Sequence, residues 1–295
     1  MNDLIALIDS LQTQPASHGK SPLKHLGLIS CANTVHISHV PFYEHCIVVV
    51  LSGRKVIFDT PGKVTCEAGA ALAIPAPGSF NLCNERDVDG RQYRALIIPF
   101  THLQLERLRK IHDFAQIGQH TDVGVLKFTC DEVLLASLKH YLASPAEPRI
   151  QAHRLIEVLL VLAEQDARLL SYSLNQESWS QKVQAVLAAD LGREWQLAEV
   201  CHRLATSESS LRRRLHAEGV GFRDLLYELR LSSALAQLLQ TSVPVYQIAY
   251  DCGYQSVSRF TSNFRKRFGL PPSEFRASVS ESEQILAVTE QVAMS

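Results

Sequence analysis

The spacing of apolar residues is short in the first third of the chain and becomes longer after Thr101. Before that point, short β-branched and apolar runs such as CIVVVL, KVTC, ALAIP and YRALIIPF lie between segments rich in Gly, Pro, Asn or Asp. Over residues 23–100 this pattern predicts a series of short strands, and EHCIVVVLSGRKVIFDT predicts a hairpin that turns at SGR. We therefore expect a small β-sandwich or barrel in this part of the chain.

After Thr101, apolar residues recur three and four positions apart, which is typical of amphipathic helices. The segments THLQLERLRKIHDFA, DEVLLASLKHYLAS and IQAHRLIEVLLVLAEQDARLL fit this period, and Pro145 and Pro148 break the chain before the third. The third segment has a wide apolar side that needs a partner, either in the same chain or in a second copy. We expect a homodimer through the helices of residues 101–170, followed by a polar linker at residues 172–178.

The last third of the chain contains two similar helical segments. They read LAEVCHRLATSESSLRRRLHAEG and VYQIAYDCGYQSVSRFTSNFRKRFG, each with a short apolar helix, a tight break, a Ser-rich start and a basic helix. The segment FRDLLYELRLSSALAQLLQTS between them predicts one uninterrupted helix. The expected arrangement is two tri-helical, helix-turn-helix units joined by a long linker helix.

In the first unit, Ser207 is the expected N-cap of the basic helix, and Leu211 and Leu215 form its buried side. Arg214 lies nearer the buried edge than the other two arginines of the run. The exposed side is expected to carry five polar or basic residues, namely Ser209, Ser210, Arg212, Arg213 and His216.

In the second unit, Phe260 and Phe264 repeat the buried pair. Gly253 lies at the break, where a positive φ or a close helix approach favours glycine. The start and the exposed side of this basic helix are expected to carry Ser256, Ser258, Arg259, Thr261, Ser262, Arg265 and Lys266.

A polar and basic helix face suits the DNA major groove, because Arg can bind guanine in bidentate fashion and surrounding Lys and Arg neutralise phosphates. Either basic helix alone would fit the solvated face of a plain helical bundle. The repetition of caps, breaks and apolar positions favours DNA binding instead. Residues 178–280 also carry 13 Lys+Arg and 9 Asp+Glu, whereas the rest of the chain carries 16 and 21.

At these residues the chain resembles the AraC/XylS family of bacterial transcription regulators. The resemblance is carried by IAYDCGYQSVSRFTSNFRKRFGLPPSEFR in the second unit and, more loosely, by SESSLRRRLHAEGVGF and LRLSSALAQLL. It implies a sequence-specific DNA-binding protein, an activator or a dual regulator, that contacts promoter DNA and RNA polymerase. It also implies a cupin-like sensor and dimerisation domain in the N-terminal part.

The resemblance implies base-reading roles at positions that nearly coincide with the two exposed faces. These positions are Ser209, Arg212 and Arg213 in the first unit and Ser258, Arg259, Thr261 and Ser262 in the second. Several of the second set are serines, where many family members have larger readers such as Gln or Arg. We therefore expect the second helix to act mainly through phosphates and RNA polymerase.

The function of the N-terminal part stays open between three hypotheses. The first is a cupin-type metalloenzyme, because PGKVTCEAGAALAIPAPGS resembles a jelly roll and HISHVPFYEHC holds His36, His39, Glu44 and His45. Against it, no H-x-H pair is present, and strand alternation puts His36 and His39 on opposite faces. We expect no metal, cofactor or catalytic residue. The other two are a sensor that binds a small-molecule effector in the barrel, and an effector-free domain that dimerises or binds a protein.

The predicted fold class is α+β with two domains. Residues 1–171 form the cupin-like sensor and dimerisation domain, 172–178 the linker, 179–280 the double helix-turn-helix domain and 281–295 a tail. No signal peptide and no apolar run long enough to span a bilayer are evident. The seven cysteines are scattered without a C-x-x-C pair, which is typical of reduced thiols. We expect a cytoplasmic protein with no membrane partner.

Overall fold

The computed structural model describes residues 1–13, 27–31, 33–42, 44–59, 62–111, 123–143, 148–174 and 178–277. The chain divides into two compact units. The N-terminal unit comprises Met1–His36 and Glu44–Gln176, and the C-terminal unit comprises Ile37–Tyr43 and Glu177–Ser295. The domain bounds predicted from the sequence remain predictions, and the tail at 281–295 lies outside the described residues.

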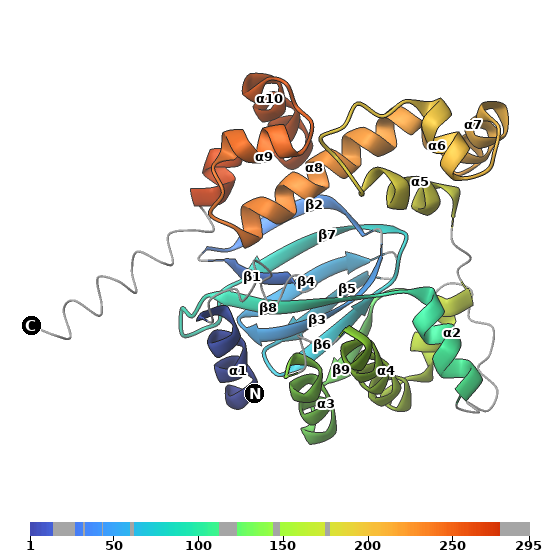
Figure 1. Cartoon of the computed structure of the whole chain (residues 1–295). Coiled ribbons are helices and arrows are strands. Elements are labelled where there is room, and N and C mark those ends of the chain that lie inside the picture. Colours follow the sequence, from blue (N-terminus) through green and yellow to red (C-terminus); the bar gives the residue numbers. More distant parts are fainter. Residues whose placement is uncertain are drawn as a thin grey trace, which may run out of the picture. The chain divides into compact units, whose positions relative to one another are not determined.

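The described strands form two sheets (Figure 1). The five-stranded sheet has the order β1-β8-β3-β6-β9, and the four-stranded sheet has the order β2-β7-β4-β5. The pairings that the structure defines in both sheets are antiparallel. The strands are β1 (Gly27–Cys31), β2 (Val35–Phe42), β3 (His45–Ser52), β4 (Arg54–Asp59), β5 (Gly62–Glu67), β6 (Ala70–Ile74), β7 (Gly78–Glu85), β8 (Tyr93–Phe100) and β9 (Leu126–Thr129).

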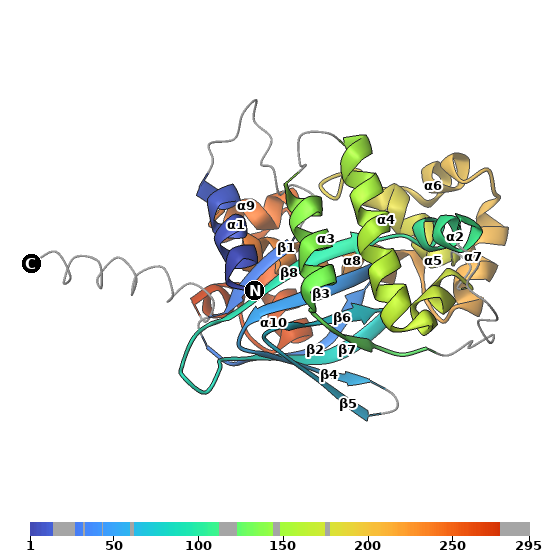
Figure 2. The same ribbon diagram turned by 90° about the horizontal axis from the view of Figure 1, so that it is seen from below.

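Strand β3 is buried on both faces, which explains why every residue of CIVVVL is apolar. Ile47, Val49 and Leu51 point to one face and pack in a core with helices. Those helices are α1 (Asn2–Thr13), α2 (His102–Ile111), α3 (Glu132–Leu142) and α4 (Pro148–Gln165). Figure 2 shows α3 and α4 crossing the sheet that contains β3 and β6.

The predicted hairpin at SGR is wrong. Gly53 turns with a φ of 74°, but β3 pairs with β6 and β8, whereas β4 pairs with β5 and β7. The turn therefore connects the two sheets, because both edges of β3 are already occupied by other strands of its own sheet. The hairpin of this region is β4–β5, with Asp59 opposite Gly62.

The helices predicted after Thr101 are present as α2, α3 and α4, and Asp131 caps α3 through a hydrogen bond from the Leu134 amide. Pro148 does not end a segment but is the first residue of α4, a position where its missing N–H costs nothing. Helix α1 and strand β9 are additional elements. Their patterns are too short or too mixed for the sequence to reveal them.

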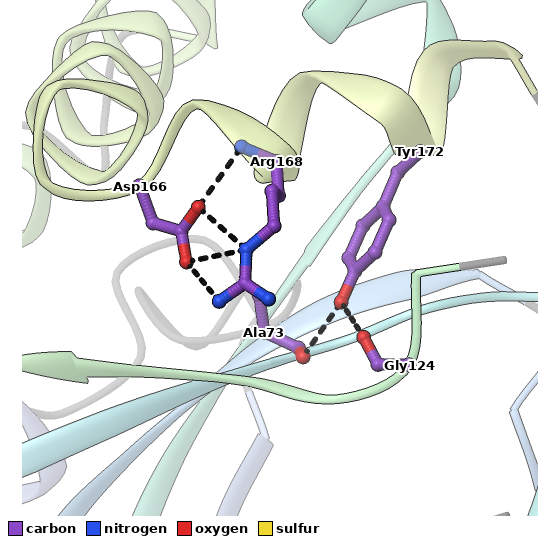
Figure 3. A network of polar contacts seen from close by, with 5 residues as sticks. All are labelled: Ala73, Gly124, Asp166, Arg168 and Tyr172. Atoms are coloured by element: carbon purple, nitrogen blue, oxygen red, sulfur yellow. Dashed lines mark hydrogen bonds and ion pairs between the residues drawn. The ribbon is translucent and has the colours of Figure 1, made fainter. Parts of the chain in front are cut away.

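The first three residues of the predicted linker, 172–174, form the end of the 3₁₀ helix η2 (Ala167–Leu174). Tyr172 is buried, and its hydroxyl donates to the Ala73 carbonyl at 3.0 Å or the Gly124 carbonyl at 2.7 Å (Figure 3). Asp166 accepts from the backbone and the guanidinium of Arg168 at the start of η2. The end of the N-terminal unit is therefore anchored on the sheet.

Between residues 179 and 277 the regular elements of the C-terminal unit are helices. Its helices are α5 (Trp179–Leu187), α6 (Leu197–Arg203), α7 (Glu208–Ala217), α8 (Phe222–Gln240), α9 (Val245–Asp251) and α10 (Val257–Phe268). Helices α5, α6 and α7 pack on one another, while α8, α9 and α10 pack together, and α8 also contacts α5. Within the described ranges, no helix has both the length and the apolar character needed to cross a membrane.

Candidate DNA-binding surface

Each pair α6–α7 and α9–α10 is a helix-turn-helix with the same turn geometry. After α6, the Thr206 amide donates to the Cys201 carbonyl at 3.0 Å, and after α9 the Tyr254 amide donates to the Ala249 carbonyl at 2.9 Å. These six-to-one hydrogen bonds require a residue with positive φ inside the turn. Gly253 supplies it with a φ of 79°, and Ala205 takes a φ of 48° in the first unit.

Gly253 is also a point of close approach. A Cβ atom there would lie 2.5 Å from both the Arg230 Nη2 atom and the Leu191 carbonyl oxygen. Arg230 on α8 donates to the Leu191 carbonyl at 3.1 Å and to the Arg193 carbonyl at 2.9 Å. The glycine therefore lets α9 end against the arginine that ties α8 to the loop before α6.

The caps and buried sides of α7 and α10 confirm the predicted wheels. Ser207 accepts a hydrogen bond from the Ser210 amide at 3.2 Å, and Ser256 accepts one from the Arg259 amide at 3.4 Å. The buried pairs are Leu211 with Leu215 and Phe260 with Phe264, none of them more than 1% exposed. In each basic helix, one buried pair of apolar residues thus determines which side of the helix faces outward.

The predicted site residues lie on those outward sides. Eleven of the thirteen are exposed, and Ser210 and Thr261 are half-buried. The exposed ones are Ser207, Ser209, Arg212, Arg213, His216, Ser256, Ser258, Arg259, Ser262, Arg265 and Lys266. The structure thus gathers the predicted residues on two helix faces, one on α7 and one on α10; we call these the α7 face and the α10 face.

The arginine triplet on α7 divides into three different environments. The guanidinium of Arg214 lies 4.0 Å from the centre of the Trp179 ring, as its predicted place near the buried edge requires. Arg212 forms an exposed ion pair with Glu208 at 3.4 Å, which is weak because both groups are solvated. Arg213 has no ion pair or side-chain hydrogen bond among the described residues, so its guanidinium is available to a ligand.

The basic run on α10 divides in the same way. Arg267 is tied to α8 by an ion pair with Glu228 at 2.7 Å. Arg265 and Lys266 are exposed, and neither forms an ion pair within the described part of the chain. In both helices the last basic residue of the run therefore holds the fold together, and the preceding ones point to solvent.

Sequence reasoning missed the residues that hold α7 in place from helix α5. The Trp179 and Ser180 amides donate to the Glu218 carboxylate at 2.7 and 2.9 Å, and Lys182 covers the Trp179 ring at 4.9 Å. These contacts join segments almost forty residues apart, so no local period could reveal them. The available signal was Ser178, three residues before Gln181, because together they form the capping box that begins α5.

The α7 and α10 faces carry the groups needed to bind an anionic polymer whose groove is wide enough to admit a helix. Exposed guanidinium and hydroxyl groups alternate on each face, and such groups donate hydrogen bonds to phosphates and base edges. In the described ranges, no group of three or more His, Cys, Asp or Glu side chains is placed to hold a metal ion. His36 lies 3.5 Å from Cys83, and His45 is buried elsewhere.

Two family models match the chain. Residues 200–278 match a helix-turn-helix domain, and residues 45–172 match the ExsA N-terminal regulatory domain. The Escherichia coli protein Rns, a DNA-binding dual transcriptional regulator, is 35% identical over 251 residues, which cover 82% of this chain and 94% of Rns. The chain belongs to the AraC family of transcription regulators. Its family membership confirms the resemblance seen in the helix-turn-helix residues.

Other AraC-family relatives match over a shorter length. The urease operon transcriptional activator of Escherichia coli is 34% identical over 106 residues, which cover 36% of each protein. The first relatives are therefore matched over less than half of their own length.

A crystal structure of an apo variant of ToxT from Vibrio cholerae shares the fold with a TM-score of 0.63 at 16% identity, covering 86% of this chain and 97% of ToxT. The expectation of a β-rich N-terminal domain followed by a helical helix-turn-helix domain is thereby confirmed. The matched domains and relatives are those of AraC-family regulators and not of enzymes, so the cupin-type metalloenzyme is excluded.

Proposed function

We propose that the protein is a sequence-specific DNA-binding transcription regulator, an activator or a dual regulator, that reads two adjacent major grooves with α7 and α10. The observation that carries this proposal is the repeated geometry of the α7 and α10 faces, each presenting exposed basic residues on a helix whose opposite side is buried. In this proposal α8 is the linker helix that sets the spacing of the two recognition helices. Arg259 and the serines of α10 contact mainly phosphates.

The test of this function is DNA binding by residues 178–280 alone. We expect the fragment to fold, as judged by its helical circular dichroism. It should bind promoter DNA with an affinity that falls as salt increases, because its Lys and Arg side chains contact phosphates. The measurement is fluorescence anisotropy of labelled DNA at two salt concentrations. A folded fragment with no affinity for DNA at low salt would count against the proposal.

Arg213→Ala is expected to weaken binding to a cognate promoter by about 1–3 kcal/mol, because Arg213 is the arginine of α7 for which the described residues supply no partner. Discrimination at one base should be relaxed as well. Arg213→Lys is the matched control, since it keeps the charge but not the bidentate fork. An equal loss on cognate and random DNA would restrict Arg213 to phosphate contact.

The N-terminal unit is proposed to control this activity as a cupin-like sensor and dimerisation domain. One solved structure of ToxT holds an unsaturated fatty acid, which supports control by a small effector in proteins of this fold. Val133 on α3 and Ile150 on α4 are 63% and 48% exposed, which supports a homodimer through these helices. RNA polymerase is the proposed protein partner at the promoter, and the cytoplasm is the proposed location.

A further inference from the structure

The first turn of α5 is capped by the end of α7. The Glu218 carboxylate accepts a hydrogen bond from the Trp179 amide at 2.7 Å and another from the Ser180 amide at 2.9 Å. The next amide of α5, that of Gln181, donates to the Ser178 hydroxyl at 3.2 Å. Amides in the first turn of a helix have no acceptor within that helix, and a carboxylate suits them because the helix dipole is positive there. The start of α5 therefore depends on α7 for two of its hydrogen bonds.

Glu218 is itself a fixed part of α7. It is the residue that ends the helix, and its amide donates to the Arg214 carbonyl at 3.2 Å. Gly219 follows with a φ of 73°, and the Val220 amide donates to the Leu215 carbonyl at 3.0 Å, which closes the helix end. The carboxylate that caps α5 is therefore attached to backbone that is bonded into the last turn of α7.

A second contact joins the same two turns. The Arg214 guanidinium lies 4.0 Å from the centre of the Trp179 ring, and Arg214 lies one helical turn before Glu218 on α7. The last turn of α7 is thus held to the first turn of α5 at two points. We call the four residues Trp179, Ser180, Arg214 and Glu218 the α5–α7 clamp.

The α5–α7 clamp follows directly after the chain that joins the two units. On the N-terminal side, Tyr172 fastens η2 to its own unit through hydrogen bonds of its hydroxyl. Residues 175–177 join the end of η2 to Ser178, the N-cap of α5. The chain from Leu174 to Ser178 can extend over at most about 14 Å. A connection this short has little slack to absorb a displacement of η2.

Helix α10 is held instead by α8 and α9. It packs against these two helices, and its last basic residue, Arg267, pairs with Glu228 of α8 at 2.7 Å. Helix α7 packs against α5 and α6, as Figure 1 shows for the C-terminal unit. The two basic helices repeat in sequence, but they differ in their support, because only that of α7 includes the helix that begins at the linker.

We propose that Glu218 and Trp179 are positioning residues through which the linker controls the α7 face, so that the N-terminal unit alters the DNA contacts of α7 and leaves those of α10 unchanged. The proposal rests on the proposed function, since it assigns the regulation of that DNA-binding site. A displacement of η2 reaches the first turn of α5 through the linker, and the α5–α7 clamp passes it to the last turn of α7. Regulation then acts on one of the two grooves and not on DNA binding as a whole.

The first experiment is amide hydrogen exchange of the full chain without DNA, followed by mass spectrometry. Glu218→Ala removes both acceptor oxygens, so the amides of the first turn of α5 and the last turn of α7 should exchange about tenfold faster, while those of α10 keep their wild-type rates. Glu218→Gln keeps one acceptor oxygen and should have a smaller effect. Glu228→Ala is the matched control, because it removes the partner of Arg267 and should accelerate exchange in α10 but not in α7.

The second experiment tests whether the linker acts through the α5–α7 clamp. A Gly-Ser-Gly-Ser insertion after Gln176 gives the linker slack, and it should change the exchange rate in the last turn of α7 by about twofold or more, with α10 unchanged. The same insertion in a Glu218→Ala chain should have no further effect on α7, because the α5–α7 clamp is already open.

The third experiment measures DNA contacts by hydroxyl-radical footprinting on a duplex that the wild-type full chain selects from a random library. Arg213→Ala identifies the half of the site that α7 protects, and Arg259→Ala identifies the half that α10 protects. Trp179→Ala should reduce protection in the α7 half alone. Trp179→Phe keeps a ring beside Arg214 and should restore most of that protection.

The proposal is overturned if Glu218→Ala accelerates exchange in α7 and α10 alike, as a merely structural role would, or leaves α7 unchanged. It is also overturned if the linker insertion leaves α7 unchanged, or changes it equally with and without Glu218. Equal loss of protection in both halves of the DNA site in Trp179→Ala would have the same consequence. A wild-type chain that selects no duplex would refute the proposed function, and the exchange rates would still decide the role of the α5–α7 clamp.

Discussion

Phe264→Ala is expected to lower the free energy of unfolding of the C-terminal unit by about 3–5 kcal/mol, the range for truncating a buried phenylalanine. Phe264 is 0% exposed, and its ring centre lies 5.7, 4.7 and 5.9 Å from the ring centres of Phe260, Phe268 and Phe275. Truncation leaves three aromatic rings around a cavity. Because these rings hold α10 in place, the α10 face should lose its fixed direction as well.

Urea denaturation followed by helical circular dichroism measures this effect. Phe58→Ala is the control, because it removes the same side chain from a position that is 45% exposed and should cost much less. Trp179 lies in α5 and Trp195 in the loop before α6, and both pack in the core that α5, α6 and α7 share, so their fluorescence reports separately on that part. A change below about 1 kcal/mol in Phe264→Ala would contradict the packing described for α10.

Acidification is expected to destabilise the N-terminal unit between pH 6.5 and about 4. Burial first, and the nearby charge of His102 second, lower the pKa of His45 from 6.5 to about 4. Between these values the unfolded chain binds a proton that the folded chain does not, so stability is present above pH 6.5 and is lost as the pH falls. The loss should reach about 3 kcal/mol near pH 4, since each pKa unit between 6.5 and about 4 corresponds to about 1.4 kcal/mol.

His45 is held in its neutral form by its contacts. The Ala76 amide donates to its Nδ1 atom at 2.8 Å, and its ring stacks between those of Phe100 and Tyr172 with centres 5.4 and 5.2 Å away. His45→Asn keeps an acceptor for the amide but does not titrate. It should be less stable at neutral pH, because the stacking is lost, and should lack the acid slope over this range.

The measurement is urea denaturation of the full chain at four pH values about one unit apart, from about pH 4, near the lowered pKa of His45, to neutrality. Strand circular dichroism follows the N-terminal unit, and tryptophan fluorescence follows the C-terminal unit, which should change little over this range. The hydrogen bond from Arg54 lowers the pKa of Glu85. Carboxylates of this kind change the free energy of unfolding mainly at lower pH than His45 does. An equal slope in wild type and His45→Asn would remove His45 as the cause.

The C-terminal helices could be predicted in detail because their structure is encoded locally. Ser207, Leu211 and Leu215 lie close together in the chain, and their spacing alone sets the cap and the buried side of α7. The repeat in α9–α10 supplied an independent second copy of that information. The exposed directions of Arg212 and Arg213 followed directly from this wheel.

The partners of Arg214 and Arg267 were beyond sequence reasoning. Arg214 contacts Trp179, and Arg267 contacts Glu228, both more than thirty residues away in the chain. Such pairs depend on how helices pack, and helix packing leaves no period in the sequence. The wheel could place Arg214 near an edge but could not say what lies at that edge.

The sheets show the same limit. The CIVVVL run predicts a strand, but the neighbours of that strand, β6 and β8, are set by long-range pairing. The nearest strand in sequence, β4, was therefore assigned to it incorrectly. Lys55 on β4 is only 3% exposed, with its ammonium 5.6 Å from the centre of the Tyr93 ring on β8 of the other sheet, and a single lysine beside a turn gives no sign of such burial in the sequence.

Helix α8 is fixed at two points, since Arg230 binds the loop before α6 and Glu228 binds Arg267 on α10. Each residue of an α-helix turns the chain by about 100° and advances it by about 1.5 Å. One inserted or deleted residue beyond these contacts would rotate everything that packs on the far end of α8. An insertion or deletion in this helix should therefore disturb the fold more than a substitution of one of its surface residues, and loops should tolerate changes in chain length better.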